Sequence, residues 1–148
     1  MRDQNAVYEF QLKRKKIRHL PEAERRTSPD KIVAFLRAIG LQDEENERVI
    51  ILSLDNKNNI RGYHTAAVGA GNCCSVTPVD VFRTPIMQGA AAIIFAHNHP
   101  SGCPDPSQQD IKHSIRIAEA GELLKVSVLD SIVIAENGHV SMRERGYF

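Results

Sequence analysis

Residues 90–110 read Ala-Ala-Ala-Ile-Ile-Phe-Ala-His-Asn-His-Pro-Ser-Gly-Cys-Pro-Asp-Pro-Ser-Gln-Gln-Asp, and this stretch decides the fold. The apolar run 90–96 is too short for an independent helix, and it lies between Gly89 and a loop rich in proline. A short run bounded in this way is typical of a buried strand. The stretch therefore predicts a strand that ends at His97, then a loop, then a new element.

Two histidines stand where this strand ends, and an aspartate follows after the loop. His97 and His99 are two residues apart, so their side chains point to the same side of an extended backbone. Asp110 adds a carboxylate. Two imidazoles and one carboxylate suit Zn²⁺ with an open fourth position, the arrangement of catalytic rather than structural zinc sites. We therefore expect His97, His99 and Asp110 to bind one zinc ion.

The segment between the histidines and Asp110 indicates a fixed loop and the start of a helix. Gly102 permits a sharp turn, and three prolines restrict the backbone: Pro100, Pro104 and Pro106. Ser107 and Asp110, spaced S-x-x-D ahead of an apolar stripe, are typical of a first helical turn. This pair alone fits an ordinary N-cap and its reciprocal partner. The conjunction of strand end, rigid loop and helix start favours a metal site.

The spacing of His97, His99, Ser107 and Asp110 resembles the JAMM (MPN+) metalloprotease signature. Residues 95–102, Phe-Ala-His-Asn-His-Pro-Ser-Gly, resemble the RadC branch of the JAB domain family in particular. The likeness runs from residue 28 to the C-terminus and implies one α/β domain over residues 28–148. The implied JAB/MPN, or cytidine-deaminase-like, fold has a mixed, mostly antiparallel sheet flanked by helices. The implied activity is zinc-dependent hydrolysis of a peptide or isopeptide bond by a zinc-activated water.

The resemblance also indicates two catalytic residues. The JAMM pattern places the general base as a Glu at the start of an upstream strand, and Glu47 matches it just before the apolar run 49–54. Glu45 is the alternative base, because residues i and i−2 share a strand face. Ser107 would donate a hydrogen bond to the developing oxyanion, in addition to its capping role.

The composition fits one globular domain in a reducing compartment. The chain has 148 residues, is 42% hydrophobic and carries a net charge of +1, which does not suggest a general nucleic-acid binder. No apolar run is long enough to span a bilayer, and the N-terminus has no signal-peptide pattern. Three cysteines, two of them adjacent, do not make a disulfide framework. We therefore expect a cytoplasmic protein that does not enter a membrane.

Residues 1–27 precede the domain and hold two features. The alternation at residues 7–12 predicts an edge strand. Residues 13–18 carry five basic side chains in six positions. We favour a solvated arm or protection of the sheet edge. The alternative is a contact with nucleic acid or an acidic partner, although no interleaved aromatic residue supports base stacking.

The remaining pattern predicts three helices and several strands. Helices are expected from Ser28 to Gly40, from Thr77 onward with Pro85 kinking or shortening it, and from Ser107 to Gly121. Strands are expected at 49–54, as two strands within 60–76, at 124–129, at 131–134 and after a hairpin turn at Asn137-Gly138. Neither His64 nor His113 is expected to bind the metal, and His113 is expected to be exposed.

Three functions remain open from the sequence. The first is a zinc hydrolase with a peptide or protein substrate. The second is a nucleic-acid enzyme or repair factor, suggested by the RadC family's DNA-repair name and supported independently only by the basic segment 13–18. The third is a non-catalytic JAB binding module, against which the complete motif argues. Cys103 could add a thiolate ligand that closes the site, but its position is outside the family's ligand pattern.

Overall fold

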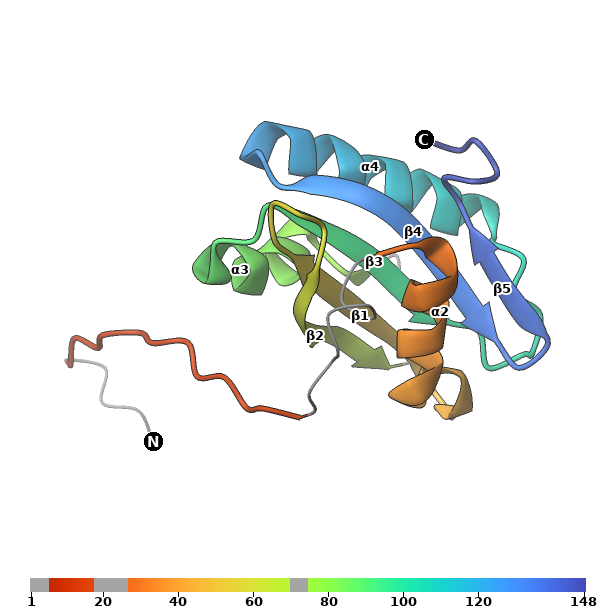
Figure 1. The fold of residues 1–148 in the computed structure, drawn as a ribbon, viewed down its shortest axis with the longest axis horizontal. Helices are drawn as coiled ribbons and strands as arrows, with labels where there is room; N and C mark the ends of the chain where they lie inside the picture. The colour runs from red at the N-terminus through yellow and green to blue at the C-terminus, as the bar shows by residue number, and fades with distance from the viewer. Residues whose placement is uncertain (1–5, 18–26, 70–74) are drawn as a thin grey trace.

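A five-stranded sheet forms the centre of the computed structural model, which describes residues 6–17, 27–69 and 75–148 (Figure 1). The strands lie side by side in the order β2-β1-β3-β4-β5. Along the chain the elements are α2 (Pro29–Ala38), η1 (Leu41–Asp43), β1 (Glu47–Leu54), β2 (Ile60–Gly69), α3 (Pro78–Gln88), β3 (Ala92–Asn98), α4 (Gln108–Leu124), β4 (Ser127–Ala135) and β5 (Gly138–Ser141). This alternation of helices and strands confirms the predicted α/β class.

The sheet is mixed and mostly antiparallel, as predicted. β1 pairs antiparallel with both β2 and β3, and β4 pairs antiparallel with β5. β3 and β4 run parallel, and α4 provides the crossover that a parallel pair needs. Because of this crossover, the loop that leaves the end of β3 leads directly into the first turn of α4.

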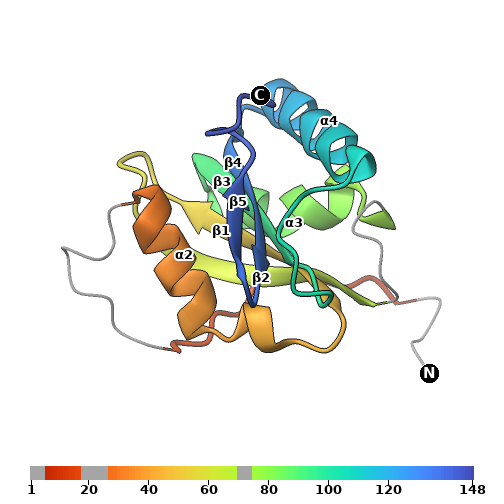
Figure 2. The same ribbon diagram turned by 90° about the vertical axis from the view of Figure 1, so that its right-hand side faces the viewer.

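Helices cover both faces of the sheet: α2 lies on one face, and α3 and α4 lie on the other (Figure 2). Successive side chains of a strand point to opposite faces, so β1 contributes to two cores. Ile50 and Leu52 pack on the α2 side, whereas Val49 and Ile51 pack on the α3 and α4 side. The central strands are therefore held from both faces. No helix in the described part of the chain is long and apolar enough to cross a membrane.

Short polar side chains cap the described α-helices, as the sequence predicts. Ser28 accepts a hydrogen bond from the backbone N–H of Lys31 at the start of α2, and Thr77 and Ser107 begin α3 and α4 with capping boxes. α3 runs through Pro85 and ends three residues later, at Gln88. The proline therefore does not end the helix where it occurs.

α4 continues past Gly121, where the sequence predicts its end. A Cβ at Gly121 would lie 2.5 Å from the carbonyl oxygen of Val126 and 3.2 Å from the ring of Phe82. The left-handed residue that ends the helix is Lys125, with φ of 59°. Gly121 is therefore required by close packing inside the helix, so the predicted boundary is wrong. The two strands predicted after it form the single strand β4.

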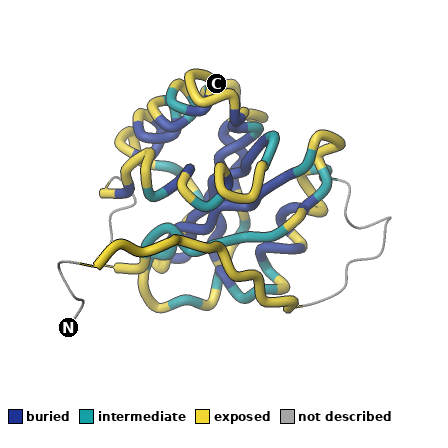
Figure 3. Tube along the Cα trace, turned by 90° about the vertical axis from the view of Figure 1, so that its left-hand side faces the viewer, coloured by how far each residue is buried: buried dark blue, intermediate teal, exposed yellow. Residues whose placement is uncertain are grey.

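One predicted strand does not form, and another falls mostly outside the described residues. Residues 6–17, which include the expected edge strand 7–12, have no regular secondary structure and are exposed (Figure 3). Phe10, for example, is 79% exposed. An alternating pattern forms a strand only where a neighbouring strand provides hydrogen bonds, and this segment has none. Of the two strands expected within 60–76, the first is β2. Most of the second falls on residues 70–74, which lie outside the described residues, and Ser75 and Val76 lead into α3.

Candidate metal centre

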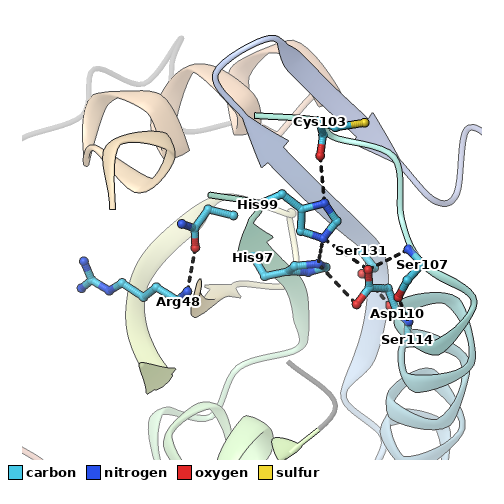
Figure 4. A network of polar contacts seen from close by, with 9 residues as sticks. Arg48, His97, His99, Cys103, Ser107, Asp110, Ser114 and Ser131 are labelled. Atoms are coloured by element: carbon cyan, nitrogen blue, oxygen red, sulfur yellow. Dashed lines mark hydrogen bonds and ion pairs between the residues drawn. The ribbon is translucent and has the colours of Figure 1, made fainter. Parts of the chain in front are cut away.

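His97 and His99 lie at the end of β3, where the sheet meets the loop that leads to α4 (Figure 4). His97 is fully buried, and His99 is partly exposed. The two side chains approach each other as their spacing predicts, with their Nε2 atoms 3.1 Å apart. A tetrahedral zinc ion with Zn–N bonds of about 2.0–2.1 Å separates its two nitrogens by roughly 3.3 Å. The observed separation is close to that geometry.

Asp110 completes the cluster from the first turn of α4. Its side chain is 8% exposed, with Oδ2 3.3 Å from His99 Nε2 and Oδ1 3.7 Å from His97 Nε2. One ligand atom from each of His97, His99 and Asp110 lies within 4.8 Å of the others. The structure thus brings the three predicted ligands together in a cluster that could bind a metal ion.

The cap of α4 holds the Asp110 carboxylate in place. The backbone N–H of Ser107 donates to Asp110 Oδ2 at 2.8 Å, and the backbone N–H of Asp110 donates to Ser107 Oγ at 3.0 Å. The same contacts satisfy two N–H groups that a helix start leaves unpaired. The ordinary N-cap that the sequence left as an alternative is present, and it also fixes the carboxylate beside the imidazoles.

The loop after β3 orients His99. His99 Nδ1 lies 2.9 Å from the carbonyl oxygen of Cys103, and Gly102 makes the turn between them with φ of +86°. A carbonyl only accepts hydrogen bonds, so Nδ1 carries the proton and Nε2 presents its lone pair to the cluster. The Cys103 thiol is exposed and contacts Asp105 at 3.6 Å. Cys103 therefore contributes its backbone to the site, and its sulfur is not part of the cluster.

Asp110 changes the protonation of His99. The hydrogen bond with Asp110 raises the pKa of His99 above its ordinary value of 6.5, and partial burial opposes this effect. The proton and a metal ion compete for the same nitrogen. Metal binding is therefore expected to weaken as the pH falls.

An open pocket of about 760 Å³ lies beside the cluster, and His99, Asp110, Ser107 and Glu47 line it. Glu47 begins β1, and Val49, two residues later, pairs in register with His97. Residues two apart share a strand face, so Glu47 and His97 lie on the same side of the sheet. The structure thus places both predicted catalytic side chains next to the three predicted ligands.

Glu45 lines the same pocket but differs from Glu47 in its backbone. It lies in the bend before β1 and is exposed, whereas Glu47 belongs to the strand and is partly buried. The negative charge of Glu47 contributes to the raised pKa of His99. Glu47 is therefore the one of the two carboxylates whose charge acts on a residue of the cluster.

Asn98 supports this arrangement, and the sequence reasoning missed it. The side chain lies between the two histidines in sequence and points to the opposite face. Its Oδ1 accepts from the backbone N–H of Arg48 at 2.6 Å, and its Nδ2 donates to the carbonyls of Glu44 and Asn46 at 3.2 and 3.1 Å. Asn98 thus fastens the segment that carries Glu47 to the end of β3. Strand alternation at a His-Asn-His sequence is the signal that could have indicated it.

The two other histidines singled out in the sequence lie outside the cluster. His64 Nε2 is 3.2 Å from the backbone carbonyl of Asp80, and burial lowers its pKa. His113 is buried against the ring of Phe95 with a centroid distance of 5.7 Å, so the expectation that it is exposed is wrong. It lies on the face of α4 that packs on the sheet, and burial lowers its pKa.

Comparison with known proteins agrees with the fold. Residues 26–147 match the RadC-like JAB domain. Similar proteins include a UPF0758 protein of Carboxydothermus hydrogenoformans, 39% identical over 82% of this chain and 53% of its own length. A second, from Syntrophotalea carbinolica, is 41% identical over 93% of this chain and 60% of its own length. The chain thus spans little more than half of the curated relatives that it matches. With nearly its whole described domain covered, the chain belongs to the RadC-like JAB domain family.

Proposed function

We propose that this protein is a zinc-dependent hydrolase of the JAMM type that cleaves a peptide or isopeptide bond. The observation that carries the proposal is the meeting of three ligand atoms with two further polar side chains at one open pocket. His97, His99 and Asp110 form the cluster, and Glu47 and Ser107 line the pocket beside it. A binding module without catalysis would not need an acid–base group and a hydroxyl at this place.

Zinc is the metal that best fits the donor set. Two imidazole nitrogens and one carboxylate oxygen are borderline and hard ligands, and three protein ligands leave one position open toward the pocket. When bound, zinc would lower the pKa of its water ligand to about 7 and polarise a carbonyl group. The chain's own contribution is to hold the ligands: Cys103 orients His99, and Ser107 fixes Asp110.

Glu47 and Ser107 are assigned the proton and oxyanion roles. The Glu47 carboxylate takes a proton from the attacking water and passes it to the leaving amine. Ser107 Oγ accepts from the Asp110 backbone N–H, and its O–H can still donate to the carbonyl oxygen as negative charge develops there. In this assignment the Ser107 oxygen accepts a hydrogen bond in the cap, and its hydrogen is donated during catalysis.

The position of the basic segment weighs against a nucleic-acid substrate at this centre. Arg14 lines a different pocket, together with Leu54 and Gly89, at the end of β1 opposite to Glu47. A strand of eight residues places its two ends roughly 23 Å apart. Arg14 is therefore not among the residues that line the pocket beside the cluster.

Metal analysis of the untagged protein is the first test. We expect about one zinc per chain, and none in a His97→Ala/His99→Ala variant. The loaded protein is then screened against peptide and isopeptide substrates, with Glu47→Gln as the inactive variant and Glu45→Gln as its matched control. Full activity of Glu47→Gln and loss of activity in Glu45→Gln would reassign the base. Failure to bind zinc at neutral pH would refute the hydrolase.

A further inference from the structure

The two histidines of the cluster differ at their second ring nitrogen. His99 Nδ1 has the carbonyl of Cys103 as its partner, at 2.9 Å. His97 Nδ1 is buried and has no hydrogen-bond partner among the described residues. Metal-binding histidines almost always donate this second N–H to an acceptor, which fixes the tautomer and the ring orientation. His97 therefore needs an acceptor that is not an adjacent backbone or side-chain group.

A second buried side-chain nitrogen without a partner among the described residues lies on the same face of the sheet as His97, in α4. His113 is 7% exposed, and its Nε2 is buried and unpartnered within the described chain. His113 follows Asp110 by three residues in α4, so the two side chains lie on one face of the helix. The ring of Phe95 contacts both imidazoles, with centroid distances of 6.1 Å to His97 and 5.7 Å to His113.

The two nitrogens are chemically complementary. When His97 Nε2 faces the metal, His97 Nδ1 carries the proton and is a donor. A neutral His113 protonated at Nδ1 offers Nε2 as an acceptor. The two atoms form no direct hydrogen bond, because neither has a partner among the described residues. One buried water can accept from the first and donate to the second, and buried waters commonly satisfy polar groups of this kind.

We propose that His113 is a positioning residue for the metal centre: one buried water accepts a hydrogen bond from His97 Nδ1 and donates one to His113 Nε2, which fixes His97 with Nε2 toward the ion. This inference rests on the proposed function, since it concerns a ligand of the same metal site. It gives a role to a side chain that touches neither metal nor substrate. His113 would act on the affinity for the ion and on the tautomer of His97.

Zinc affinity, measured by competition with a chelator, tests the proposal in three variants. His113→Leu removes the nitrogens but keeps the bulk, and we expect zinc to bind about 10-fold more weakly. His113→Gln, whose amide oxygen can accept, should recover part of the affinity. His64→Leu is the matched control, because His64 Nδ1 is also buried and unpartnered but lies outside the cluster. It should bind zinc as the unaltered protein does.

The tautomers can be read from long-range ¹H–¹⁵N NMR spectra of the unaltered, zinc-loaded protein, so the test does not depend on a variant that folds. We expect His97 and His113 both to be protonated at Nδ1. A proton at His113 Nε2, or unchanged zinc affinity in a folded His113→Leu protein, would overturn the proposal. If the unaltered protein binds no zinc, the proposed function fails and this inference fails with it. If it binds zinc and His113 has no effect, only the inference fails.

Discussion

The first turns of α3 and α4 share one local structure but have different surroundings. Thr77 and Asp80 form the capping box of α3, and Ser107 and Asp110 form that of α4. At α3, both the backbone N–H and the hydroxyl of Thr77 donate to Asp80 Oδ2, at 2.9 and 2.7 Å. At α4, the backbone N–H of Ser107 donates to Asp110 Oδ2 at 2.8 Å, and the Ser107 hydroxyl oxygen accepts from the Asp110 backbone N–H at 3.0 Å. The Thr77 hydroxyl thus donates its proton to the carboxylate of its own cap, whereas the proposed function has the Ser107 hydroxyl donate its proton to the substrate.

The surroundings of the two carboxylates explain why only one cap belongs to a candidate site. Asp80 lies at the surface, and the hydrogen bonds from Thr77 lower its pKa. Asp110 is buried beside His97 and His99, which arrive from the end of β3. A capping box therefore fixes the position of a carboxylate. Whether that carboxylate can bind a metal ion depends on the side chains that the facing strand end places beside it. Three comparisons between the caps test this view.

Replacing the aspartates should give the largest difference. In Asp110→Asn the cluster loses its only carboxylate, and zinc affinity should fall by more than the roughly 10- to 100-fold typical of losing a ligand's hydrogen-bond partner. In Asp80→Asn zinc binding should be unchanged and only thermal stability should fall. Zinc titration and melting temperature measure the two effects. Equal zinc affinity in the two variants would show that Asp110 is not a ligand.

Removing the hydroxyls should give an intermediate effect. Glycine is tolerated at an N-cap, with a cost of only about 0.3 kcal/mol relative to serine or threonine. Ser107→Gly should therefore keep the fold but lower kcat about 100- to 1000-fold, because the oxyanion loses a donor. Thr77→Gly should change stability by a similar small amount and leave kcat unaffected. Unchanged kcat in Ser107→Gly would show that Ser107 caps the helix and has no catalytic role.

Local sequence was enough to predict the ligand cluster's geometry. His97, His99 and Asp110 lie within 14 residues, and strand alternation and cap spacing fix how such neighbours approach. The position of Glu47 came from family resemblance, because its approach depends on the register between β1 and β3. Asn98 was missed for the same reason: its partners lie about 50 residues away in the chain. Strand alternation places the Asn98 side chain on the face opposite the histidines, but no local pattern identifies the distant groups that it binds.

The wrong predictions have a related cause. The burial of His113 depends on which face of α4 meets Phe95, and the lone histidine gave no sign of it. The alternation at residues 7–12 looked like a strand, but an alternating pattern does not provide the neighbouring edge that a strand requires. In both cases a tertiary contact, which the local pattern does not encode, decides the structure.

The smallest expected difference between the caps is in the pH dependence of stability without metal. Asp110 raises the pKa of His99 above 6.5, so the protonated pair stabilises the metal-free fold fully below pH 6.5 and this contribution is lost as pH rises through the raised pKa. Asp80 behaves in the opposite sense. Its pKa is lowered from 3.8, so its contribution is present above pH 3.8 and is lost as the pH falls through the lowered value.

Melting temperatures of the chelator-treated proteins from pH of about 3 to about 9 separate these two signs. The difference between the unaltered protein and Asp110→Asn should shrink as the pH rises through the raised pKa of His99. The difference between the unaltered protein and Asp80→Asn should stay constant there and shrink only in acid. A difference for Asp110→Asn that stays flat across the titration of His99 would mean that Asp110 does not hold a proton on His99. The two caps would then be electrostatically equivalent, and only their neighbours would distinguish them.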